Sequence, residues 1–229
     1  MTMVVTDAPL RSEASEARVT LAQWAWTFVP FGLGLVAAML LAELTQDLRL
    51  FRTVYAVRVS MLLAIPALVL FPFRDRSPAV KNYWRLFWTF SLLAYAVHFA
   101  YAWFGVFGGQ VETSRLHPEL FHVAQGATPF DLIRAHQGDL IAFSNLVLTG
   151  LWLLDVALAW LARGSRGFVA FFHALTWLYV LVSFAVASVL FYKNMTSYAI
   201  GWVMVAATAL ALIVRAFSRG PAPSPSSPS

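Results

Sequence analysis

Apolar residues in this chain gather into six runs of about 20 residues, separated by segments that carry most of the charges. A bilayer core roughly 30 Å thick needs about 20 helical residues to cross it, so each run is long enough for a transmembrane helix. The pattern predicts an all-α, polytopic membrane helical bundle, with spans at residues 21–42, 54–73, 83–107, 139–162, 168–192 and 197–217.

The segments outside the runs predict one transmembrane domain, residues 21–218, between two tails. Residues 1–20 mix acids and bases without a signal-peptide pattern, which indicates a cytoplasmic N-terminal tail. Residues 108–138 form the one long connection, an outer loop in which a helix-start pattern at Thr128 predicts the beginning of the fourth helix. Residues 219–229 are rich in Pro and Ser and are predicted to be disordered.

The distribution of Lys and Arg predicts the orientation, because positively charged loops are retained in the cytoplasm. With both termini inside, ten basic residues fall on the inner side: Arg11, Arg18, Arg74, Arg76, Lys81, Arg85, Arg163, Arg166, Arg215 and Arg219. Six fall on the outer side: Arg49, Arg52, Arg58, Arg115, Arg134 and Lys193. The excess on the inner side predicts that the N- and C-termini are both cytoplasmic.

Composition agrees with a chain that is solvated mostly by lipid. Of the residues, 60% are hydrophobic and 12% charged, against about 25% charged in soluble domains. The net charge of +5 resides in short loops and forms no basic face, which argues against a nucleic-acid partner. With no cysteine, the chain has no disulfide, catalytic thiolate or iron–sulfur cluster. It carries no phosphate loop, nucleophile elbow or zincin motif, so a soluble hydrolase is excluded and enzyme activity is left open.

Three ionisable residues fall inside predicted spans, where a charge costs a few kcal/mol and calls for a partner or a function. His98 lies 13 residues after Arg85, which predicts a depth about 20 Å from the inner face. His173 lies one to two turns into the fifth span, and Asp155 lies at nearly the same depth on the neighbouring helix. These depths predict that Asp155 and His173 can form a hydrogen-bonded pair.

Three interpretations of these residues are open. In the first, His98 and His173 are axial ligands of haem b, and Asp155 or a carbonyl orients the ring of His173. In the second, Asp155 and His173 are a proton or cation relay. In the third, each histidine is neutral and simply hydrogen-bonded inside the bundle.

The outer loop holds four further candidates for metal binding, His117, Glu119, His122 and His136. The spacing of the first three resembles a metal-ligand pattern, but the segment begins His-Pro and is loop-like, so nothing holds the side chains on one helix face. A solvated interfacial loop is the preferred interpretation.

Aromatic residues near span ends predict anchors at the membrane–water interface. Trp24 and Trp26 lie near one end of the first span, and Tyr83, Trp84 and Trp88 lie near the inner end of the third. Anchors of this kind need bind nothing.

Three segments carry a resemblance to a known family. They are the second span from Leu62 to Arg74, the pairing of Arg85 with His98 in an aromatic-rich span, and the run from Phe172 to Leu178. In these segments the chain resembles the ferric-reductase-like transmembrane domain family, which includes the haem-binding membrane subunit of a periplasmic methionine sulfoxide reductase system.

The resemblance implies an electron-transport function of oxidoreductase type in a bacterial inner membrane, with haem b, a quinone and a redox partner protein. It also implies that His98 and His173 bind the haem and that Arg58 or Arg85 lies near the propionates. The chain departs from the family on the fifth helix, where the family's second histidine is replaced by Val186 and Ala187.

A rival hypothesis comes from another class of protein. It describes a non-enzymatic membrane scaffold or complex subunit, or a small proton-coupled permease that uses Asp155 and His173. Small residues of the last span, which permit close packing within the bundle or against a membrane-complex partner, fit the scaffold: Ala206, Ala207, Ala209 and Ala211.

Overall fold

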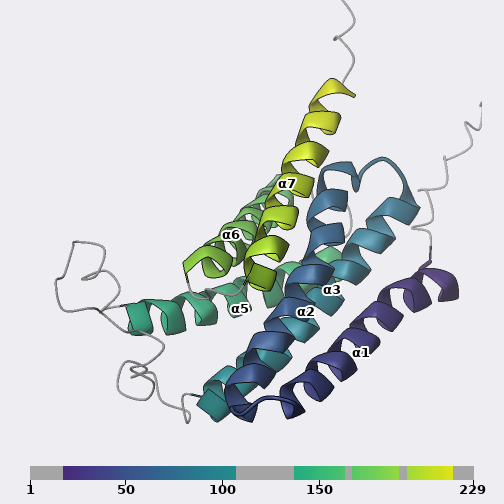
Figure 1. Ribbon diagram of the computed structural model, residues 1–229. Coiled ribbons are helices and arrows are strands. Elements are labelled where there is room, and N and C mark those ends of the chain that lie inside the picture. The colour runs from purple at the N-terminus through teal and green to yellow at the C-terminus, as the bar shows by residue number, and fades with distance from the viewer. Residues whose placement is uncertain (1–17, 107–136, 163–166, 191–194, 219–229) are drawn as a thin grey trace, which may run out of the picture.

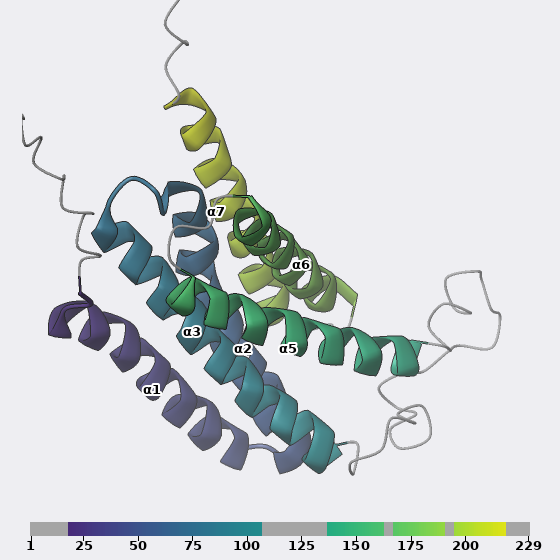
Figure 2. The same ribbon diagram turned by 180° about the vertical axis from the view of Figure 1, so that it is seen from behind.

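Six long helices build the part of the chain that the computed structural model describes, residues 18–106, 137–162, 167–190 and 195–218 (Figures 1 and 2). All six are long and apolar enough to cross a membrane, so the all-α polytopic prediction is confirmed and the protein is an integral membrane protein. In chain order the elements are α1 (Leu21–Glu43), α2 (Leu48–Leu70), a 3₁₀ turn η1 (Phe71–Phe73), α3 (Pro78–Ala100), a π-helix η2 (Tyr101–Val106), α5 (Gln137–Leu161), α6 (Phe168–Leu190) and α7 (Met195–Phe217).

Two helices begin earlier than the hydropathy pattern predicts, because capping residues rather than apolar residues set their starts. Asp47 caps α2, where its Oδ1 accepts a hydrogen bond from the backbone N–H of Leu50 at 3.0 Å. Ser77 caps α3 in the same way, and Pro78 occupies the first helical position. The predicted starts at residues 54 and 83 are therefore too late as helix boundaries.

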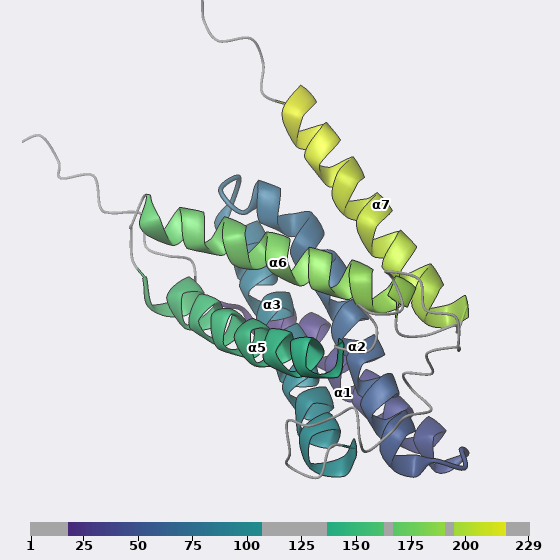
Figure 3. The ribbon, with the colours of Figure 1, turned by 90° about the vertical axis from the view of Figure 1, so that its left-hand side faces the viewer.

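The centre of the bundle is the α2–α3 pair, and the other helices pack around it. α1 packs on both, α7 packs on α2 and α6, and α5 packs on α3 and α6. Figure 3 shows α5 and α6 side by side, in front of α2 and α3. Ser60 and Ser91, both fully buried, join α2 to α3: each hydroxyl donates to the other residue's carbonyl, at 2.8 and 2.7 Å.

The core contains several fully buried aromatic side chains, among them Trp84, Trp88, Trp152, Tyr95 and Phe184. Trp84 and Trp88 are 2% and 1% exposed, so their predicted role as interfacial anchors is wrong. Both turn toward α5 and α6, because their spacing of four residues puts them on one face of α3. Trp24 and Trp26 are exposed, and their anchoring role stays a prediction.

Several predictions concern segments outside the described residues. Both tails, most of the 108–138 loop and the helix start at Thr128 fall there, together with the loop candidates His117, Glu119, His122 and His136. These remain predictions from sequence.

Candidate functional site

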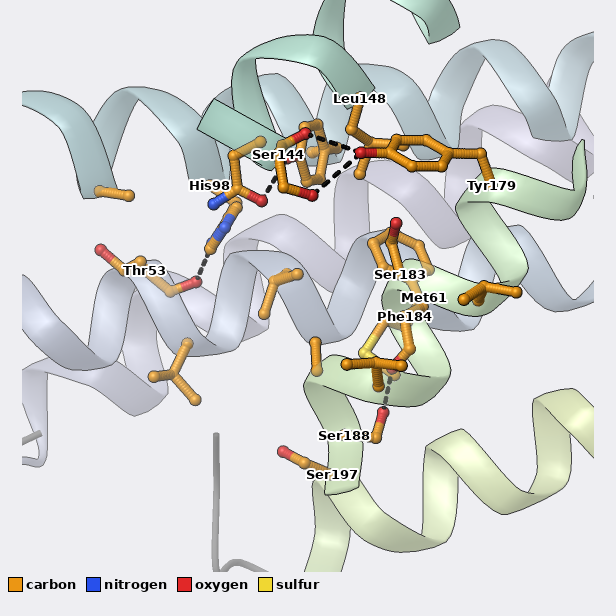
Figure 4. Close-up of a pocket in the computed structure, with 18 residues that line it drawn as sticks. Thr53, Met61, His98, Ser144, Leu148, Tyr179, Ser183, Phe184, Ser188 and Ser197 are labelled. Atoms are coloured by element: carbon orange, nitrogen blue, oxygen red, sulfur yellow. Dashed lines mark hydrogen bonds between the residues drawn. The ribbon is translucent and has the colours of Figure 1, made fainter. Parts of the chain in front are cut away.

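A cavity of about 500 Å³ lies between α2, α3, α5, α6 and α7, in the half of the bundle predicted to face outward (Figure 4). Most of its wall is apolar, with a few polar side chains between them. Val182 and Val186 line it and are also 49% and 43% exposed on the outer surface of α6. The cavity therefore lies next to the lipid-facing surface of α6 at these two side chains. A mostly apolar cavity with a few polar groups is the usual form of a small-molecule site.

His98 is the one histidine on the described wall of the cavity. Its imidazole is suited to accept a proton or to bind a metal. Its Nδ1 lies 2.9 Å from the backbone carbonyl oxygen of Thr53. Because a carbonyl only accepts, Nδ1 must carry the hydrogen of the neutral ring, which leaves the lone pair on Nε2. Nε2 has no hydrogen-bond partner among the described residues. His98 thus offers the cavity a nitrogen that can accept a proton or bind a metal.

Two tyrosines bring further polar groups to the wall. The hydroxyl of Tyr179 lies 3.0 Å from Oγ of Ser144, and the hydroxyl of Tyr95 donates to Oδ1 of Asn145 at 3.2 Å (Figure 4). These bonds join α5 to α6 and to α3, so the polar groups hold the walls of the cavity together as well as lining it.

Arg58 lies beside the cavity. It is 8% exposed, its Nε donates to Oγ of Ser197 at 3.0 Å, and its guanidinium lies 5.0 Å from the ring centre of Tyr55. Ser197 itself lines the cavity. Only the side chain of Ser197 therefore links the positive charge of Arg58 to the wall of the cavity.

Arg85 lies elsewhere, in the half of the bundle predicted to face the cytoplasm. It is 5% exposed, and its guanidinium lies 5.4 Å from the ring centre of Trp160 on α5. It does not line the cavity. Of the two arginines named as propionate partners, Arg58 is the one with a hydrogen bond to a residue of the described cavity wall, Ser197.

A second polar cluster lies at the inner end of the bundle and contains Asp155, His173 and Trp88. Asp155 is fully buried, and its two oxygens accept separate hydrogen bonds. Oδ1 lies 2.6 Å from Nδ1 of His173, and Oδ2 accepts from Nε1 of Trp88 at 2.7 Å. The predicted Asp155–His173 pair is confirmed, and it ties α3, α5 and α6 together.

The two clusters are distinct, since neither Asp155 nor His173 lines the cavity. Aromatic rings fill the space between them. Ring centres are 5.4 Å apart from His98 to Tyr95, 5.6 Å from Tyr95 to Trp152 and 4.8 Å from Trp152 to Trp88. The structure thus does not bring His98 and His173 to one shared site.

Two residues of these sites, Trp88 and Thr53, were not predicted from the sequence. Trp88 was interpreted from its position near a span end, and no spacing in the chain pairs it with Asp155. Thr53 contributes a backbone carbonyl, which every residue has, so no sequence signal could have identified it. Among the described residues, no three His, Cys, Asp or Glu side chains are grouped to hold a metal ion.

Comparison of the chain with protein-family models, with curated proteins and with solved structures finds no match. The resemblance to the ferric-reductase-like family therefore rests on the chain's own residues. The protein is an integral membrane protein with a mostly apolar cavity that His98 lines.

Proposed function

We propose that the protein is a haem b electron-transfer subunit of ferric-reductase-like type and that His98 is an axial ligand. One observation carries the proposal: Thr53 fixes the Nδ1–H of His98, which leaves the Nε2 lone pair for the cavity. Histidines that bind metals through one nitrogen usually donate the other N–H to a carbonyl or carboxylate in this way.

The surroundings of His98 suit a large, flat, mostly apolar group that carries carboxylates. The cavity volume is within the range of about 300–1,000 Å³ that is typical of ligand sites. Arg58 is suited to pair with a propionate, since a guanidinium binds carboxylates in a fork geometry. Met61 supplies the one thioether on the described wall, and a thioether would be a chemically suitable second donor to a haem iron.

His173 is not a ligand in this proposal, because the cavity does not reach it. Bound haem supplies reversible one-electron chemistry, and the protein's part is to hold the group, exclude water and set its electrostatic surroundings. A quinol as electron donor, a redox partner protein as acceptor and a bacterial inner membrane as location belong to the same proposal.

The test is the absorption spectrum of the purified protein in mild detergent, with haem supplied during expression. We expect a Soret band and, after dithionite reduction, the α band of a b-type cytochrome. His98→Ala should abolish both bands, because it removes the only histidine on the described cavity wall. His173→Ala, which removes a buried histidine outside the cavity, should keep them.

A featureless spectrum from well-folded protein would overturn the haem proposal. Retention of bound quinol in extracts of such a protein, lost in His98→Ala, would then identify the cavity as a quinol site. Absence of both ligands would favour the rival hypothesis of a scaffold or permease.

A further inference from the structure

The Asp155–His173 pair has the hydrogen-bond arrangement of a histidine that is oriented to exchange a proton. Both carboxylate oxygens of Asp155 are used, one by His173 and one by Trp88. Since a carboxylate only accepts, Nδ1 of His173 is the donor and carries a hydrogen. Any additional proton must therefore bind at Nε2.

Nε2 of His173 is available to receive that proton. It has no hydrogen-bond partner among the described residues. It is also not among the unpaired side-chain nitrogen and oxygen atoms that are completely buried, so some of its surface is accessible. The side chain is 8% exposed. His173 is the sixth residue of α6, so it lies about 8 Å from the start of the helix at a rise of 1.5 Å per residue. The nearest aqueous phase is the one at that end of the bundle.

The charge of the pair differs by one unit between the two states. Without the additional proton, the Asp155 carboxylate and a neutral His173 carry −1; with the proton on Nε2 they carry zero. In the negative state the carboxylate is fully buried, and it is compensated by the hydrogen bond from Trp88 and by the positive charge of Arg74.

Among the described residues, few other charged groups interact with the pair. Arg74, at the end of η1, interacts electrostatically with Asp155, with Asp75 and with Arg215 of α7. The pKa of Arg74 is lowered, chiefly by burial and also by the charge of Arg215, and the two carboxylates offset only part of the effect. On the α3–α5 side, Arg85 lies over Trp160, beyond Trp88. Among these groups Asp75 is the one other carboxylate, and it lies in the connection beside Arg74.

We propose that Asp155 and His173 form a proton-binding site that takes up and releases one proton, at Nε2 of His173, from the aqueous phase at the start of α6. The proton comes from water at that face and returns to it, so no other reactant is needed. The site is independent of the proposed haem function, because it makes no contact with the cavity.

The test is the infrared difference spectrum of the reconstituted protein between two pH values, about pH 5 and 8, that bracket the ordinary charge change of histidine. Because the chain has five histidines, we expect the native spectrum to contain, among its histidine bands, one imidazole band and one perturbed carboxylate band that depend on His173. His173→Gln should remove both. Asp155→Asn, which keeps an oxygen for Trp88 but removes the charge, should remove the carboxylate band and shift the imidazole band.

His98→Gln is the matched control, because it removes the other intramembrane histidine and should leave the bands unchanged. Loss of the bands in His98→Gln, their persistence in His173→Gln, or their absence from the native protein would each overturn the proposal. If Asp155→Asn fails to fold, the same infrared difference spectrum of native protein with ¹⁵N-labelled histidine tests the proposal. The site requires that His173 gains a second ring N–H at low pH. A native protein without haem bands that keeps this signal would refute the proposed function and retain the proton site.

Discussion

Gly201 allows α7 to approach α6 closely, and this contact depends on the absence of a side chain. A Cβ at this position would lie 2.5 Å from Cβ and 2.7 Å from Oγ of Ser188. We expect Gly201→Ala to destabilise the protein by about 1–3 kcal/mol, the usual cost of overpacking. Unfolding in detergent mixtures, followed by circular dichroism, measures the change.

Gly150 provides the control, because a Cβ there would meet nothing within 4 Å. Gly150→Ala should be neutral or should stabilise α5 by up to about 1 kcal/mol through helix propensity. Adding Ser188→Gly to Gly201→Ala removes the atoms that clash and should recover part of the loss. If Gly201→Ala is as harmless as Gly150→Ala, the close contact between α6 and α7 is incorrect.

Some residue contacts followed from the sequence and some could not. Depth is readable, because 1.5 Å per residue and short connections fix how far Asp155 and His173 lie from a membrane face. Rotation about the helix axis is harder to read, which is why Trp88 was expected at the lipid interface and is instead bonded to Asp155. The partner of His98 is a backbone carbonyl, on which residue identity has no bearing.

Among the helices, α2 and α3 are joined by polar contacts that lipid cannot replace. Ser60→Ala and Ser91→Ala each remove one hydroxyl-to-carbonyl bond and leave the packing volume almost unchanged. We expect each substitution to cost about 0.6 kcal/mol, and at most about 1.7, as for interhelical hydrogen bonds in other membrane proteins. The same unfolding measurement detects the loss.

Ser218→Ala is the control for Ser60→Ala and Ser91→Ala, since Ser218 directly follows α7, is exposed, and its hydroxyl donates to the carbonyl of Val214 near the end of that helix and not to another helix. It should leave the stability of the bundle unchanged. Equal effects at all three serines would mean that helix propensity, and not the α2–α3 contact, accounts for the losses.

At the level of helices, hydropathy predicted the six long helices of the described residues and the bounds of α1, α6 and α7 to within two residues, and it missed the starts of α2 and α3. The starts of α2 and α3 are set by Asp47 and Ser77, which are polar and so fall outside an apolar window. The end of α3 continues as the π-helix Tyr101–Val106. A π-turn has one more residue than an α-turn, a difference that the spacing of apolar residues over six positions cannot reveal.

In the whole molecule, the two polar clusters lie toward opposite faces of the membrane. The His98 cavity lies toward the N-terminal end of α2, and the Asp155–His173 pair lies toward the start of α6. The orientation of the bundle therefore decides which compartment supplies protons to His173 and which half of the bilayer borders the cavity. The number of spans alone leaves this undecided, and the distribution of basic residues predicts it.

The absence of cysteine makes the orientation directly testable. Gln46 lies exposed in the α1–α2 connection, and Ala79 lies exposed at the start of α3. With ten basic residues against six favouring cytoplasmic termini, Gln46→Cys should react with a membrane-impermeant maleimide in intact spheroplasts of an expression host. Ala79→Cys should react only after permeabilisation, and the unmodified chain should never react. The reverse pattern would invert the molecule, so that protons reach His173 from outside the cell and the cavity borders the cytoplasmic leaflet.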